Sequence, residues 1–325
     1  MDSTGSPHTL PPFVVLFGPT ASGKTSLLFE LAHRGHDAFP GGGAWFEVVS
    51  ADSMQVYRGM DIGTAKPSAD ERRELPHHLI DIRNPDEQFT VGDFVREAEA
   101  RIREIASRGR LPVVSGGTAF YLRALLCGMP PTPPTDPAVR AGIEGELEAS
   151  SLPELYHQLE QCDPVSAANI DPHDAFRIVR ALEVYRVSGR PRSSFLEPRT
   201  LRAGLTCRVY AVTLDRSRLY ENIDTRVERM FDAGLLEEVD RLKQAGYGAD
   251  TQALRAIGYR EFFADTDTSR IRAAIQRNSR RYAKRQITFS HLIPGRVEIG
   301  PGDVQTLFQG CAQTLRLLLN SRENR

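Results

Sequence analysis

A short loop bounded by two glycines, "GPTASGKT" at residues 18–25, carries the residue types that bind phosphate. Gly18 and Gly23 enclose four residues, and Lys24 and Thr25 follow directly. In such a loop the backbone N–H groups surround phosphate oxygens, the lysine ammonium supplies positive charge, and the threonine hydroxyl can bind Mg²⁺. The predicted diphosphate site, with Thr25 as metal ligand, consists of Gly18, Pro19, Thr20, Ala21, Ser22, Gly23, Lys24 and Thr25. The loop alone does not distinguish a nucleotide from another diphosphate.

A carboxylate stands at the end of the next apolar run, "WFEVVSAD" at 45–52. We expect Asp52 to face the same crevice as the phosphate loop, because the carboxyl ends of parallel strands meet at one edge of a sheet. There it could hold magnesium or take a proton from a substrate. Alternatively, Asp52 caps the following turn, a role that Ser53 could share. Its position leaves both chemistries open.

A basic segment lies near the other end of the chain. From Ser269 to His291 there is no acidic residue, and the seven cations are Arg270, Arg272, Arg277, Arg280, Arg281, Lys284 and Arg285. Four of them, at positions 277, 280, 281 and 284, are spaced three or four apart and share one helical face. Such a stripe suits a phosphodiester backbone, where each neutralised phosphate adds salt-dependent affinity. The alternative is a solvated basic face balanced by acids elsewhere.

The elements that position these residues alternate between strands and helices. Short apolar runs at 13–17, 45–52, 110–117 and 208–215 predict buried strands, and helical segments separate them. Strands that alternate with helices pair in parallel through right-handed crossovers. We therefore predict an α/β fold, a P-loop NTPase-like doubly wound parallel sheet with an inserted all-helical domain.

Prolines in "CGMPPTPPTDPAVR" mark the start of the insertion, because they forbid a long helix. A capping box from Ser151 to Glu154 predicts the start of one inserted helix, and Gly189 the end of another. The predicted domains are a disordered leader at 1–12, a core at 13–137 and 196–325, and the helical insertion at 138–195.

Composition excludes several classes of protein. The chain has 325 residues and a formal net charge of -1, so charge must be located segment by segment. The four cysteines stand singly, which predicts a reducing compartment and no structural zinc. No signal pattern or bilayer-spanning stretch is present, so we expect a cytoplasmic protein with no membrane partner. His77, His78 and Asp81 could suggest a metal site, but the apolar residues between them favour a strand edge.

Eight blocks of sequence occur in the order typical of tRNA dimethylallyltransferases, and the chain resembles that family from about residue 13 to 292. The blocks are "GPTASGKT", "SADSMQVYRGMDIGTAKP", "HHLIDI", "VVSGGTAFYLRALL", "RIVRALEVYRVSG", "TRVERMFDAGLLEEV", "ALRAIGYREF" and "KRQITF". The phosphate loop is generic, whereas the second and the last two blocks are specific. No Cys/His zinc module follows residue 292, so the resemblance is to the bacterial type.

The resemblance implies transfer of the five-carbon group of dimethylallyl diphosphate to N6 of the adenosine at tRNA position 37, just 3′ of the anticodon, with release of diphosphate. The implied partners are the tRNA anticodon stem-loop and dimethylallyl diphosphate, and the implied cofactor is Mg²⁺. We expect the chain to be a monomer. The loop at 18–25 would then hold a prenyl donor rather than ATP.

The resemblance also assigns residues. Asp52 matches the general base, Arg226 the arginine on the donor diphosphate, and Thr118 a further catalytic position. The implied tRNA contacts are Asp52, Ser53, Met54, Gln55, Thr118, Arg140, Phe176, Arg177, Ile178, Val179, Arg180, Arg255, Ala256, Ile257, Gly258, Tyr259, Arg260, Lys284, Arg285, Gln286, Ile287, Thr288, Phe289, Ser290 and His291. Arg226 could instead form a surface ion pair with Glu228 or Glu237, and Phe176 could belong to the core.

Two other classes of function remain open from the residues. A P-loop kinase of a nucleotide or small molecule would turn over ATP without RNA. A non-enzymatic RNA-binding protein switched by a nucleotide would bind tRNA tightly whether or not Asp52 is replaced. Relatives that prenylate free adenosine phosphates would share the loop and Asp52, but they would not need the basic stripe.

Overall fold

The computed structural model describes residues 9–36, 39 and 44–323. The chain forms two compact units, one built from residues up to 126 and from 200 onward, the other from residues 127–199. Most of the predicted leader lies outside the described residues. Leu10, near the end of the predicted leader, is described and buried. The last residues of the predicted leader therefore pack with the first unit.

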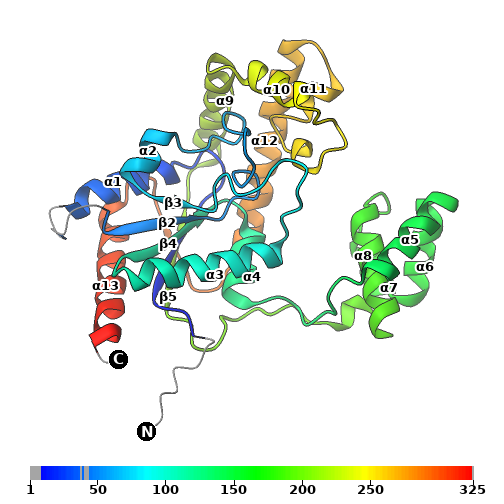
Figure 1. Ribbon diagram of the computed structural model, residues 1–325, viewed down its shortest axis with the longest axis horizontal. Coiled ribbons are helices and arrows are strands. Elements are labelled where there is room, and N and C mark those ends of the chain that lie inside the picture. Colours follow the sequence, from blue (N-terminus) through cyan, green and yellow to red (C-terminus); the bar gives the residue numbers. More distant parts are fainter. Residues whose placement is uncertain (1–8, 37–38, 40–43, 324–325) are drawn as a thin grey trace, which may run out of the picture. The chain divides into compact units, whose positions relative to one another are not determined.

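The first unit contains one six-stranded sheet with the strand order β3-β2-β4-β1-β5-β6. Every neighbouring pair of strands is parallel, which confirms the predicted α/β sheet (Figure 1). The strands are β1 (Phe13–Phe17), β2 (Phe46–Ser50), β3 (His77–His78), β4 (Leu111–Gly116), β5 (Cys207–Val212) and β6 (Arg296–Ile299). The two edge strands, β3 and β6, add to the four predicted strands.

Helices connect the strands and cover the sheet. In the described part of this unit they are α1 (Lys24–His36), α2 (Ala69–Glu74), α3 (Val91–Ser107), α4 (Ala119–Cys127), α9 (Arg216–Asp232), α10 (Leu235–Gln244), α11 (Glu261–Ala264), α12 (Thr268–Ser290) and α13 (Val304–Glu323), with a 3₁₀ turn η2 (Gln252–Arg255). Among the described residues, no helix combines the length and the apolar content that crossing a membrane requires.

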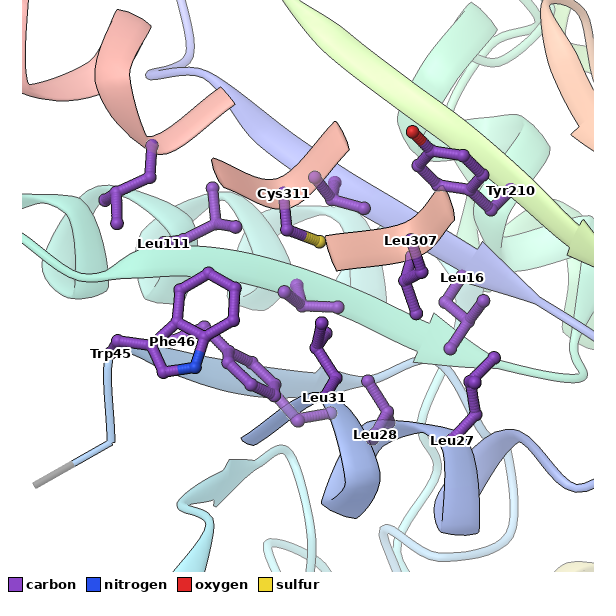
Figure 2. Close-up of a cluster of buried hydrophobic side chains, with 14 of the residues drawn as sticks. Leu16, Leu27, Leu28, Leu31, Trp45, Phe46, Leu111, Tyr210, Leu307 and Cys311 are labelled. Atoms are coloured by element: carbon purple, nitrogen blue, oxygen red, sulfur yellow. The ribbon is translucent and has the colours of Figure 1, made fainter. Parts of the chain in front are cut away.

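One face of the sheet packs against α1 and α13. Figure 2 shows Leu27 and Leu31 of α1 and Leu307 of α13 gathered with Leu16 and Phe46 of the strands, and all five belong to one buried cluster. Burying each such side chain stabilises the fold by about 1.5–3 kcal/mol. The apolar spacing at the start of α1 is therefore what fixes the helix, and the phosphate loop before it, on the sheet.

The other face is buried as well. Alternate residues of a strand point to opposite faces, and Phe13, Val15 and Phe17 of β1 are as buried as their neighbours. Helix α3 packs against β2 and β4 (Figure 1). Phe94 and Ile102 are among its buried residues. Cover on both faces explains why these strands are continuous apolar runs.

The second unit is entirely helical, as predicted for the insertion. Its helices are α5 (Pro137–Ala149), α6 (Leu152–Cys162), α7 (Pro164–Asn169) and α8 (Ala175–Ser188), followed by a 3₁₀ turn η1 (Arg192–Ser194). Ile143, Leu155, Leu159, Ile178 and Leu182 form its core. Helix α8 ends at Gly189 in the left-handed conformation, where the sequence predicts it to end.

Two predictions about this unit need correction. Its first residues precede 138, because the proline segment is bonded to α8: Arg180 donates to the Pro133 carbonyl and the Asp136 N–H donates to Glu183. The predicted capping box at Ser151 does not form. Ser151 is the N-cap of α6 but its side chain makes no cap hydrogen bond, and the backbone N–H of Glu154 donates to the Ser151 carbonyl instead.

Candidate functional site

A cavity of about 390 Å³ opens at the carboxyl ends of β1, β2 and β4. This is the edge at which ligands bind in open α/β sheets. Its walls include the phosphate loop, the turn after β2, residues 63–67, residues 115–117 at the end of β4, helix α9, residues 255–260 and helix α12. All of them belong to the first unit.

The phosphate loop has the geometry that its glycines predict. Gly23 has a φ of 88° and Ala21 a φ of 60°, both in the left-handed region. The ammonium of Lys24 donates to the carbonyls of Gly18 and Pro19, at 2.7 and 2.9 Å. The hydroxyl of Ser22 is buried and has no hydrogen-bond partner within the described residues. Because a buried polar atom without a partner is costly, this hydroxyl is a candidate for satisfaction by a bound ligand.

Positive charge converges on the cavity. Lys24 and Arg226 both line it, and Asp52 is the only carboxylate among the described lining residues. Burial, and then the nearby charge of Arg226, lower the pKa of Lys24 to about 7, although Asp52 opposes the shift. Burial also lowers the pKa of Arg226, again against the effect of Asp52. One carboxylate does not compensate both cations, so the cavity favours an anion.

Asp52 uses one of its two carboxylate oxygens to cap a turn. Its Oδ1 accepts hydrogen bonds from the backbone N–H groups of Met54 and Gln55, at 2.8 and 3.3 Å, so it does cap the turn after β2. Its Oδ2 makes no hydrogen bond with the described residues and stays available to a substrate. The turn bonds therefore hold the carboxylate in a fixed orientation at the cavity.

Thr118 lies behind this turn rather than on the cavity wall. Its Oγ1 accepts from the Ser53 N–H at 3.2 Å, and its own N–H donates to the Ala51 carbonyl. The hydroxyl of Tyr282 bonds to the Thr118 side chain, and burial raises the pKa of Tyr282 to about 12. Thr118 thus connects β4 to the Asp52 turn and to α12.

Arg226 points into the cavity and not to the surface. Its guanidinium donates to the Thr64 carbonyl at 3.3 Å. Glu228, its predicted alternative partner, instead accepts from Arg272 and Gln276 of α12. Among the described residues Arg226 forms no ion pair with Glu237 either, so the alternative of a surface ion pair for Arg226 is wrong.

The predicted tRNA residues of the first unit divide into exposed and buried groups. The exposed ones are Arg255, Arg260, Lys284, Arg285, Ile287, Thr288, Phe289 and His291, while Ser53, Met54, Gln55, Ala256 and Ile257 are partly exposed on the cavity wall. Gly258, Tyr259, Gln286 and Ser290 are buried. Gln286 joins α12 to two loops, since it accepts from the Thr20 N–H and donates to the Gly117 carbonyl. Its side chain serves the fold, so an RNA contact there stays a prediction.

The basic stripe is narrower than the sequence predicts. Arg280 pairs with Asp224 of α9, Arg272 with Glu228 of α9, and Arg270 with the two aspartates just before α12. Acids from outside the segment thus balance three of its seven cations. Arg277, Arg281, Lys284 and Arg285 are exposed and have no ion-pair partner among the residues that the structure describes.

In the second unit the predicted contacts also divide. Phe176 is 63% exposed, so its alternative place in the core is wrong, and the Arg140 guanidinium stacks on its ring at 5.5 Å. Arg177 pairs with Asp174, the N-cap residue of its own helix. Arg180 pairs with Glu183, which is buried. Ile178 and Val179 are core residues, so their side chains do not face solvent.

The sequence did not assign the loop at residues 61–66, which forms a cavity wall. Lys66 is buried there and pairs with Asp61 at 2.5 Å and with Asp81 at 2.6 Å, while donating to the Tyr57 carbonyl. His78 pairs with Glu47 instead of joining a metal site. Within the described residues, no group of three or more His, Cys, Asp or Glu is arranged to hold a metal. His77 and His78 form the edge strand β3, which fits the strand edge predicted for this segment.

Similarity to known proteins decides the family. The family model described as IPP transferase matches residues 55–291. This chain belongs to the IPP transferase family. A tRNA dimethylallyltransferase of Geobacter sulfurreducens is 46% identical over 281 residues, covering 85% of this chain and 88% of that protein. One from Heliobacterium modesticaldum is 42% identical over 282 residues, covering 85% of each.

Solved structures agree with this assignment. The full-length tRNA isopentenylpyrophosphate transferase of Bacillus halodurans is 33% identical, with a TM-score of 0.66 over 97% of this chain and 100% of that one. A eukaryotic dimethylallyltransferase acting on tRNA is 26% identical, with a TM-score of 0.75 over 93% of this chain and 77% of that one. The P-loop-like α/β fold predicted from the sequence is therefore confirmed.

Proposed function

We propose that this chain transfers the dimethylallyl group of dimethylallyl diphosphate to N6 of the adenosine at position 37 of tRNA and releases diphosphate. Membership of the IPP transferase family supports prenyl transfer, and the relatives named for tRNA support the acceptor. The observation that carries the proposal is the cavity in which Lys24 and Arg226 converge on one carboxylate, Asp52.

The donor's diphosphate would lie on the phosphate loop. Lys24 and Arg226 would neutralise it, and the loop's backbone N–H groups would bind its oxygens. Release of diphosphate leaves negative charge where these groups already point, so they stabilise the transition state of transfer. The apolar residues Ile223, Val227 and Met230 of α9 line the same cavity and suit the donor's hydrocarbon tail.

The residues present fit a magnesium ion held chiefly by the donor. Mg²⁺ keeps several waters and binds proteins through one or two ligands plus substrate phosphates. The hydroxyl of Thr25, at the start of α1 on the cavity wall, would be such a ligand. Asp52 is the carboxylate on the same wall that could be a second ligand. When bound, the ion would supply charge neutralisation for the departing diphosphate.

Asp52 would act as the general base. The N6 amine forms a bond to C1 of the allyl group while the C1–O bond breaks and its electron pair leaves with diphosphate. The proton lost by the amine passes to Oδ2 of Asp52, the oxygen that the turn bonds leave unoccupied. A base placed in this way contributes about 10²- to 10⁴-fold in rate.

The acceptor would be the anticodon stem-loop of tRNA. Its target base must leave the stack to enter a cavity, as enzymes that modify bases require. The exposed cations Arg281, Lys284 and Arg285 on α12 supply positive charge for its backbone, and Arg285 also lines the cavity. We also propose that the chain acts as a monomer. A tRNA substrate also implies that the enzyme works in the cytoplasm.

The test is to incubate the protein with Mg²⁺, dimethylallyl diphosphate and unmodified tRNA and to weigh the digested nucleosides by mass spectrometry. We expect a prenyl increment on adenosine. Asp52→Ala removes both the base and the turn cap, whereas Asp52→Asn keeps an oxygen that can accept from Met54 and Gln55. We therefore expect both variants to lose transfer, with Asp52→Asn as stable as the wild type. ATP hydrolysis without any prenyl increment would replace this proposal with a kinase.

A further inference from the structure

A buried carboxylate outside the cavity holds two of its walls. Glu238 of α10 is 2% exposed. Its Oε2 accepts from the N–H groups of Asp61 and Ile62, at 3.0 and 2.8 Å, and its Oε1 accepts from the N–H of Gly63 at 3.2 Å and the hydroxyl of Tyr259 at 2.7 Å. A carboxylate offers about four acceptor sites, and all four are used here. These bonds compensate the cost of burying the carboxylate.

The four donors come from two neighbouring segments of the cavity wall. Asp61 and Ile62 lead directly into Gly63, Thr64 and Ala65, which line the cavity, and Tyr259 lies between Gly258 and Arg260, which line it as well. The two segments are in close contact. A Cβ on Gly63 would lie 2.5 Å from the Tyr259 ring, so only glycine allows this approach. Burial, and then the charge of Glu238, raise the pKa of Tyr259, so its hydroxyl remains a donor.

The segment at residues 61–63 is followed directly by Thr64, whose carbonyl contacts Arg226 of the proposed diphosphate site. The Thr64 carbonyl, next after Gly63, accepts from Arg226 at 3.3 Å and from the Gln55 amide at 3.4 Å. Ala65 follows with a φ of 48°, a left-handed conformation that a residue other than glycine adopts only when its surroundings impose it. Tethering residues 61–63 to Glu238 therefore fixes the carbonyl that orients Arg226.

We infer that Glu238 is a positioning residue for prenyl transfer: it fixes the wall at residues 61–64 and, through the Thr64 carbonyl, places Arg226 for the donor's diphosphate without touching the donor. This inference rests on the proposed function. Nothing in the sequence signals it, because the residues that Glu238 binds in this wall lie 175 to 177 positions earlier in the chain.

Glu238→Gln tests the inference with little change of shape. An amide NH₂ cannot accept a hydrogen bond, so at least one backbone N–H of residues 61–63 loses its acceptor. We expect inorganic pyrophosphate to bind about tenfold more weakly and kcat to fall about 10- to 100-fold, as misplacement of a substrate-binding group does. The affinity for tRNA should not change. Glu237→Gln is the matched control, because it makes the same chemical change at an exposed position on the same helix.

A double-mutant cycle separates positioning from general destabilisation. If Glu238 acts through Arg226, then Glu238→Gln adds little to the loss of pyrophosphate affinity already caused by Arg226→Ala. Additive losses, or a Glu238→Gln protein that matches Glu237→Gln in pyrophosphate affinity and kcat, would overturn the inference. If Glu238→Gln does not fold, Glu238→Asp carries the same test, since it keeps the carboxylate but shortens the side chain that reaches the N–H groups of residues 61–63. Pyrophosphate affinity also reports on the inference if the wild type transfers no prenyl group, an outcome that would refute only the proposed function.

Discussion

Diphosphate binding should be coupled to proton uptake by Lys24. In the free protein the pKa of Lys24 is lowered to about 7, first by burial and then by Arg226. A group with that pKa is about nine-tenths neutral at pH 8. A neutral amine can still donate to the Gly18 and Pro19 carbonyls that hold it. A diphosphate beside it favours the charged form and raises the pKa again.

The sign and size of the effect follow from this shift. Above pH 7 the free protein must bind a proton before Lys24 can pair with diphosphate, so affinity falls as pH rises. The loss approaches a factor of ten, or about 1.4 kcal/mol, for each pH unit until the pKa of the complex is reached. Below pH 7 the lysine is already charged, and its contribution to affinity no longer depends on pH.

The assay is isothermal titration of inorganic pyrophosphate, without metal, between pH 6.5 and 8.5 in two buffers of different ionisation enthalpy. Lys24→Arg is the control, since an arginine stays charged throughout this range. The ligand's own ionisation contributes equally to both proteins, so the difference between their pH slopes belongs to Lys24. Equal slopes and equal proton uptake in the two proteins would refute the lowered pKa.

Two further predictions concern the acceptor surface and the strand ends. Replacing Arg281 and Lys284 together by alanine should weaken tRNA binding and reduce the slope of log affinity against log salt by about 1.4 to 1.8. Arg280→Ala should change that slope less, because Asp224 already neutralises Arg280. Filter binding at several salt concentrations measures the affinity and the slope. Gly116→Ala should destabilise the protein in thermal melts, because its Cβ would lie 2.2 Å from the backbone oxygen of Ala51, whereas Gly142→Ala, with open space around it in α5, should stabilise by about 0.5–1 kcal/mol.

The sequence predicts those parts of the fold that depend on local patterns. The apolar runs that became β1, β2, β4 and most of β5 are buried on both faces, and that burial favours the largely continuous hydrophobicity from which they were predicted. The edge strands lack this signal. β3 has two histidines and β6 has two exposed residues among its four, so neither shows a strand pattern. The order of strands depends on pairing between distant segments, which local patterns do not encode.

The same distinction applies to the site. The phosphate loop and Asp52 could be predicted because both follow strands whose carboxyl ends meet. The partners of the basic stripe could not, because Asp224 and Glu228 lie on α9, 56 and 44 positions from the arginines that they neutralise. A segment without acids of its own is therefore not a segment without counter-charges.

The acids around the cavity explain which cations remain for the substrates. Glu228 and Asp224 neutralise arginines of α12. Glu238 accepts hydrogen bonds from backbone N–H groups and from Tyr259 and pairs with no cation among the described residues. Lys24 and Arg226 are left with Asp52 alone, and burial lowers the pKa of each. The folded protein thus holds Arg226, and below about pH 7 a charged Lys24, in an unfavourable environment that an incoming diphosphate would relieve under the proposed function. After transfer, release of diphosphate would leave both groups without that counter-charge, so the cavity would be ready to bind the next donor.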